Sequence, residues 1–283
     1  MGKLICAELL RLRKNRLFWA LLAVIAAACT YACLMNRNPA PYYEWMVFEI
    51  TSVLSFVGAA FVGLFNGTEY SDGTMRNKLV VGHTRMAIYG ANLCVNAVAC
   101  VAFQGTVFAV MGTLGPLFIG TLGQPVEIAF YMLCSLLVMA AFAALYTAIA
   151  MVSGRKAGAI VAAFGIAFAL ILISSGIWDR LAEPETLQNG PVVVHEDGTI
   201  GIDVTEISEN PLYVPEGVVR DALTVINSSL PSGQMIALAD LILLTRSPEL
   251  DLAQHWYWPL GSTAFTLLVT AVGLTLFSRK DIK

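Results

Sequence analysis

Charged residues are scarce in this 283-residue sequence. They make up 13% of the chain, whereas hydrophobic residues make up 57% and the mean hydropathy is +0.71. A soluble domain carries about 25% charged residues, roughly twice this fraction, so the scarcity excludes an ordinary soluble protein. The net charge of −3 and the lack of a basic cluster with interleaved aromatic residues also argue against a nucleic-acid partner.

Motifs for catalysis and nucleotide binding are also missing. The sequence contains no Gly-x-x-x-x-Gly-Lys-Ser/Thr phosphate-binding loop, so we do not expect this chain to bind ATP by that route. It contains neither His-Glu-x-x-His nor Gly-x-Ser-x-Gly. The three histidines fall on both sides of the expected membrane and cannot share a site. We therefore predict no catalytic residue and no cofactor in this chain.

The cysteines do not support a disulfide framework. All six precede residue 135, namely Cys6, Cys29, Cys33, Cys94, Cys100 and Cys134. Cys29 and Cys33 share one helical face and could be metal ligands, but small soft residues in an apolar helix more often serve packing. We predict no metal site.

Long apolar runs dominate what is present. Each is near the ~20 residues that cross a bilayer as a helix, and a chain in lipid must satisfy its backbone hydrogen bonds internally. Six spans are expected, at residues 17–35, 45–65, 88–114, 128–152, 157–178 and 256–277. The expected fold class is thus an all-α polytopic membrane protein. Gly115-Pro116 and Gln124-Pro125 interrupt the pattern, and residues 113–126 form either a short loop or a partly re-entrant segment.

Basic residues predict the orientation. By our count, 13 of the 17 basic residues lie on one side of the six spans, which the positive-inside rule makes cytoplasmic. Both termini, the tail 278–283 and the connector 66–87 are therefore expected in the cytoplasm. Within residues 1–16, Leu4, Ile5, Leu9 and Leu12 share one helical face. This pattern fits an interfacial helix on the inner leaflet, or else a basic flank that only sets topology.

A polar insertion at residues 179–255 separates the last two spans. It holds 13 of the 20 acidic residues by our count. Residues 192–204 predict two short strands about an Asp197-Gly198 turn, and residues 215–227 predict a short helix. Residues 234–244 are apolar enough to lie at the outer interface or dip into it. A segment this small holds little core of its own, so it should lean on the bundle or on a partner subunit.

Polar residues in the connector carry a family resemblance. Glu69, the run Gly73-Thr74-x-Arg76-Asn77 and the later Gly82-x-x-Arg85 are similar to the signature of type-2 ABC exporter permeases. The closing Phe277-x-Arg279-Lys280-Asp281-Ile282 resembles the usual end of such subunits, and Leu230-Pro-Ser-Gly-Gln234 resembles a Firmicutes branch of them. The chain departs from the family in having Asn92 where a lysine is common, and in its larger outer insertion.

The resemblance implies a function. Such a protein is the membrane-spanning permease subunit of an ATP-binding-cassette exporter in the bacterial cytoplasmic membrane. It moves an amphipathic substrate, such as a peptide, drug or lipid, out of the cytoplasm or inner leaflet. The implied partners are membrane lipids, a second permease subunit that is identical or homologous, and a cytoplasmic ATPase that holds ATP and Mg²⁺.

The connector is the expected contact with that ATPase. A short helix after the second span would act as a lever, with Ser71 or Asp72 capping its start. Glu69 would pair with a basic residue at the membrane edge, and Arg76 and Arg85 would bridge to acidic groups. The predicted coupling residues are Glu69, Asp72, Gly73, Thr74, Arg76, Asn77 and Arg85. The alternative is a solvated loop that only fixes topology.

The second and fifth spans would line the substrate path by the same resemblance. The residues expected there are Phe48, Glu49, Thr51, Ser55, Phe56, Phe164 and Phe168, although simple core packing explains most of them as well. Glu49 lies about a turn inside its span, where an ionisable group is costly and often functional. Two other functions stay open: a non-transporting scaffold or sensor whose outer insertion binds an envelope partner, and an intramembrane enzyme using Glu49 or Glu127.

Overall fold

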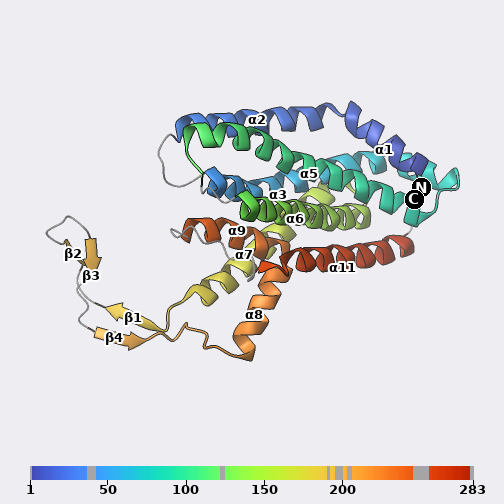
Figure 1. Cartoon of the computed structure of the whole chain (residues 1–283). Helices are drawn as coiled ribbons and strands as arrows, with labels where there is room; N and C mark the ends of the chain where they lie inside the picture. Colours follow the sequence, from blue (N-terminus) through green and yellow to red (C-terminus); the bar gives the residue numbers. More distant parts are fainter. Residues whose placement is uncertain are drawn as a thin grey trace.

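A bundle of long helices forms the body of the protein (Figure 1). The computed structural model describes residues 2–36, 43–121, 125–189, 192–194, 200–202, 206–244 and 255–280. Six helices are long and apolar enough to cross a membrane, namely α2 (Arg16–Met35), α3 (Tyr43–Ser71), α5 (Arg85–Phe118), α6 (Pro125–Ser153), α7 (Lys156–Ala182) and α11 (Trp258–Arg279). The predicted all-α polytopic class is confirmed. The first five predicted spans lie inside these helices, and the sixth overlaps α11.

Both described chain ends lie at one end of the bundle, which we call the termini end (Figure 1). Two short helices gather there, α1 (Gly2–Lys14) and α4 (Thr74–Val80). The opposite end, which we call the insertion end, carries the segment between α7 and α11. The apolar core between the two ends is built mainly by α3, α5 and α6, whose buried aromatic side chains include Phe61, Phe103, Phe142 and Tyr146.

Helix α3 is longer than a bilayer requires. Its 29 residues extend about 43 Å at ~1.5 Å per residue, compared with a hydrocarbon core of about 30 Å. The extra turns carry Glu69 and its neighbours past the apolar part of the bundle. Close packing fixes this end of α3, because a Cβ atom on Gly67 would lie 2.7 Å from the Cα atom of Lys156 in α7.

Gly115-Pro116 does not break the third span, which corrects the sequence expectation that the helix fades near Leu114. Helix α5 continues through Pro116 to Phe118. Gly115 instead provides room for an aromatic side chain, since a Cβ atom there would lie 2.5 Å from Cγ of Tyr43. Of the segment 113–126, residues 122–124 lie outside the described ranges.

The insertion combines an arm of paired strands with two helices. Strand β1 (Thr186–Asn189) pairs antiparallel with β4 (Glu206–Glu209), and β2 (Val192–Val194) pairs antiparallel with β3 (Ile200–Ile202). The β2–β3 pairing confirms the predicted hairpin strands, while the Asp197-Gly198 turn and His195 lie outside the described residues. Two helices follow, α8 (Val218–Ser229) and α9 (Pro231–Leu244), and α9 packs against α3, α6 and α7. The insertion therefore leans on the bundle.

The segment from Leu230 to Gln234 fastens the insertion to two spans. Ser232 Oγ lies 2.7 Å from Ser174 Oγ of α7. Gln234 Nε2 donates to the carbonyl oxygen of Trp258 at 2.8 Å, and Ser262 Oγ donates to Gln234 Oε1 at 2.7 Å. The segment Leu230–Gln234, whose sequence resembles that of some type-2 exporter permeases, thus connects α7, α9 and α11.

Candidate functional site

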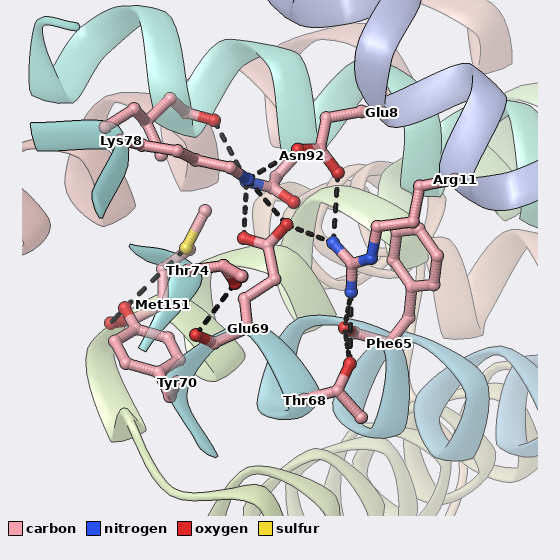
Figure 2. A network of polar contacts seen from close by, with 11 residues as sticks. Glu8, Arg11, Phe65, Thr68, Glu69, Tyr70, Thr74, Lys78, Asn92 and Met151 are labelled. Carbon is pink, nitrogen blue, oxygen red and sulfur yellow. Dashed lines mark hydrogen bonds and ion pairs between the residues drawn. The ribbon is translucent and has the colours of Figure 1, made fainter. Parts of the chain in front are cut away.

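Four charged side chains meet at the termini end (Figure 2). Lys78 Nζ of α4 lies 2.5 Å from Glu8 Oε1 of α1 and 2.5 Å from Glu69 Oε1 of α3. Arg11 Nη1 lies 3.0 Å from Glu8 Oε2 and also pairs with Glu69 Oε1. Each carboxylate therefore contacts both cations. We call this group of Glu8, Arg11, Glu69 and Lys78 the ion cluster.

The two carboxylates of the ion cluster are buried, while its two cations are partly exposed. Glu8 and Glu69 are each only 3% exposed. A buried charge is costly unless it is paired and hydrogen-bonded, and here two carboxylates are balanced by two cations. The pairing fulfils the expectation that Glu69 meets a basic residue, and it makes the positions of α1, α3 and α4 depend on one another.

Glu8 occupies the buried face of α1 together with Leu4 and Leu12. Burial by itself raises the pKa of the Glu8 carboxyl, but the Lys78 hydrogen bond and the charges of Lys78 and Arg11 together hold that pKa below its ordinary value. Glu8 is therefore ionised at neutral pH and acts as a hydrogen-bond acceptor for both cations.

Arg11 ties α1 to the end of α3. Its Nη2 atom donates to the carbonyl oxygen of Phe65 and, at 3.1 Å, to Thr68 Oγ1. Its guanidinium carbon lies 3.9 Å from the centre of the Phe65 ring, within the range of a cation–π contact. These contacts use the planar donor set of arginine, which lysine lacks.

Asn92 of α5 completes the surroundings of Glu69. Its Nδ2 atom lies 3.5 Å from Glu69 Oε2 and donates to the carbonyl oxygen of Ile88 at 3.1 Å. The position where the sequence departs from its family resemblance thus contacts Glu69 directly. A lysine at position 92 would bring a positive charge next to Glu69. In this chain Arg11 and Lys78 of the ion cluster provide that charge instead.

The turn from α3 into α4 depends on Gly73. Its φ angle is +69°, in the left-handed region that favours glycine, and it stands at the N-cap of α4 without a side-chain cap. The predicted cap by Ser71 or Asp72 is therefore wrong: Ser71 Oγ donates back to the carbonyl oxygen of Gly67 at 3.0 Å. Thr74 Oγ1 donates to the carbonyl oxygen of Glu69 at 3.1 Å, which satisfies the end of α3.

Arg85 performs a different task from the one predicted. Among the described residues it bridges to no acidic side chain; it donates through Nη1 to the carbonyl oxygens of Phe277, at 2.9 Å, and Lys280, at 2.5 Å. A cation at the C-terminus of α11 satisfies carbonyl groups that have no helical partner. Arg85 thereby joins the start of α5 to the end of α11.

Lys280 connects the end of α11 to α6 as well. Its Nζ atom donates to the carbonyl oxygen of Met151 at 3.1 Å, to which Tyr70 OH also donates at 2.8 Å. Burial lowers the pKa of Lys280. The closing sequence motif thus contributes a helix-end contact, while Asp281 and Ile282 lie outside the described residues.

The outward side of α4 and the following turn is open. Val80 is 78% exposed and Val81 is 77% exposed. Asp72, Thr74, Arg76, Asn77 and His83 are exposed around them. Two apolar side chains surrounded by polar groups at the end of a short, fixed helix form a surface suited to a protein partner. We call Arg76, Asn77, Val80 and Val81 the α4 face.

The predicted path residues do not share one surface. Phe48, Thr51 and Ser55 are buried within the chain's own bundle, and their place on a path between subunits stays a prediction. Glu49, Phe164 and Phe168 are exposed, and Phe56 is partly exposed. The rings of Phe56 and Phe164 lie 5.6 Å apart and border a groove of ≈ 280 Å³ between α2, α3 and α7.

Sequence reasoning missed Glu8, Arg11 and Lys78 as members of the site. The signal for Glu8 was its place between Leu4 and Leu12 at intervals of four residues, on the face expected to be apolar. In the described parts of the chain, no three His, Cys, Asp or Glu side chains gather as a metal site. Cys29 and Cys33 are buried and not disulfide-bonded.

Comparison with known proteins identifies a family. Residues 4–174, more than half of the chain, match the family described as ABC-2 family transporter protein. No curated protein matches the sequence.

Proposed function

This chain belongs to the ABC-2 transporter family, and we propose from that premise that a separate ATPase docks on its α4 face. The chain is the permease subunit of an ABC transporter, a multi-pass membrane protein that associates with an ABC ATPase. In the proposal the termini end lies in the cytoplasm of a bacterium, on the side to which most basic residues segregate. ATP and Mg²⁺ are bound by the ATPase.

One observation carries the proposal: α4 presents Val80 and Val81 outward while Lys78 of the same helix is held in the ion cluster. A push or pull on α4 therefore acts on α1 through Glu8 and on α3 through Glu69. Rigid contacts of this kind are what a soluble motor requires to move helices in a membrane.

The proposed cargo is amphipathic, and the proposed direction is export. Support for an apolar part of that cargo comes from the surface where α3 meets α7, at which the rings of Phe56 and Phe164 border an apolar groove. In the proposal two permease subunits, identical or homologous, face each other across this surface. ATP-driven movement of α4 would then separate and close the two α3–α7 surfaces.

The docking proposal is tested with the double variant Arg76→Ala, Val81→Asp, co-expressed with the ATPase and reconstituted in vesicles. Loss of central interface residues costs about 2 kcal/mol or more, or roughly 30-fold in affinity. We expect ATPase co-purification and permease-stimulated ATP hydrolysis to fall at least about tenfold.

The matched control is Ile207→Asp in β4, an exposed apolar residue in the insertion. This variant should retain both co-purification and stimulated hydrolysis. Full stimulation by a monodisperse Arg76→Ala, Val81→Asp variant would contradict docking on the α4 face.

A further inference from the structure

Helix α8 turns its apolar face away from the protein. Val218, Val219, Ala222, Val225 and Ile226 fall within an arc of about 120° at ~100° per residue. All five are exposed, with Val218 84% and Val225 60% exposed. A helix that packs on a protein in water normally shows the opposite arrangement, so this face needs an apolar covering.

The polar face of α8 is fixed against the protein. Arg220 donates to the carbonyl oxygens of Leu181, at the end of α7, and Val214, both at 2.8 Å. Asn227 is buried, and Gln234 Nε2 of α9 donates to the carbonyl oxygen of Ser228 at 2.5 Å. Because these contacts come from one side of the helix, they determine which side faces outward.

The position of α8 identifies the covering. The helix runs across the direction of α11 and lies beside the start of that span (Figure 1), and it packs against α7, α9 and α11. Trp256 and Tyr257 immediately precede α11, and such residues are enriched where a membrane meets water. Exposed Leu172 and Ile173 of α7 and Leu260 of α11 make the neighbouring span surfaces apolar as well.

We propose that α8 is an interfacial helix whose valine-rich face inserts into the leaflet at the insertion end of the bundle. Its partner is the boundary between lipid headgroups and acyl chains. The five residues of the face are aliphatic and include none of the aromatic or arginine side chains that usually anchor protein interfaces, which favours lipid over a second copy of the chain. The face also has no basic residue, so insertion does not require anionic lipid.

Single cysteines on the two sides of α8 test this proposal in the full chain. Exposed Cys6 and Cys94 are first replaced by serine, which leaves the four buried cysteines. Ala222→Cys and Val225→Cys report on the apolar face, and Thr224→Cys is the matched control on the other side of the same helix. Each is labelled with bimane and reconstituted in phosphatidylcholine vesicles that contain lipid brominated near the top of the acyl chain.

We expect quenching of the labels at 222 and 225 to exceed that at 224 at least threefold, with no change when anionic lipid is added. Lipid brominated at the chain end should quench all three labels weakly. Equal quenching on the two sides, or none at 222 and 225, would overturn the proposal. Efficient disulfide cross-linking between chains through Val225→Cys would assign the face to a second copy and would overturn it as well.

Discussion

Glu8 and Glu69 share Arg11 and Lys78, and this sharing makes the buried charges tolerable. Either carboxylate alone would leave one cation in excess beside a buried carboxylate. Glu69 was predictable as a residue needing a basic partner, because it stands in a polar connector beside apolar runs. Its partners were not predictable, because Arg11 and Glu8 come from a helix nearly sixty residues earlier, and only the folded bundle brings them together.

Glu8→Gln is predicted to destabilise the protein at neutral pH by about 1.5–3 kcal/mol, the usual contribution of a hydrogen bond to a charged group. The pKa of Glu8 is lowered in the folded state, so its contribution is complete above the unfolded pKa and is lost as pH falls through the folded pKa. The difference between wild type and variant should therefore shrink as the solution is acidified below about pH 4.5. Thermal unfolding in detergent from pH 7 to pH 3.5 measures both quantities.

Glu49→Gln is the control for this measurement, because Glu49 is an exposed carboxylate on α3. It should change the unfolding midpoint little at any pH, as surface substitutions usually do. A Glu8→Gln variant that matches wild type at pH 7 would show that the ion cluster contributes nothing to stability.

At the scale of elements, the junction of α3 and α4 is the place where force would enter the bundle if the ATPase docks on the α4 face as proposed. Gly73 reverses the chain through a left-handed conformation, and Thr74 then closes the end of α3. The turn places Lys78 against the ion cluster and Val80 and Val81 outside it. Sequence analysis identified the short helix and Gly73, but it did not predict that Gly73 is the N-cap of that helix. The run Ser-Asp-Gly-Thr offers several plausible N-cap residues, and only the backbone angles distinguish them.

Gly73→Ala is predicted to cost about 1–2 kcal/mol, since an alanine in the left-handed region meets steric strain. The measurement is the unfolding midpoint together with ATPase stimulation, which should fall as the turn rearranges. Gly105→Ala in α5 is the matched control: it has no atom within 4 Å of an added Cβ, so alanine should be neutral or stabilising by up to about 1 kcal/mol. Equal stability of Gly73→Ala and wild type would show that the turn tolerates another conformation.

The spans themselves were predictable because hydropathy and length determine them. The same signal failed at Gly115-Pro116, where glycine serves packing against Tyr43 rather than a helix break. It also left residues 234–244 undecided between lying at the outer interface and dipping into it. The contacts of Ser232 and Gln234 with α7 and α11 fix the start of α9 against the bundle, and these long-range contacts have no periodic pattern in the sequence.

At the scale of the whole molecule, polar contacts join the helices at both ends of an apolar bundle. The ion cluster, Arg85 and Lys280 join α1, α3, α4, α5, α6 and α11 at the termini end. Gln234 and Ser232 join α7, α9 and α11 at the insertion end. This arrangement allows a movement of α4 to be passed to several spans together, which is the property that a permease driven by a separate ATPase requires.

The most direct test of the account is a contact measurement between the permease and its ATPase. A photoreactive amino acid is placed at Val81, at Asn77 or, as a control, at Ile207 in the insertion, and membranes are irradiated with the assembled transporter. Adducts are identified by mass spectrometry as the chain that carries the phosphate-binding loop. Docking of the ATPase on the α4 face predicts adducts from positions 77 and 81 and none from position 207. An active complex that gives adducts from neither 77 nor 81 would contradict it.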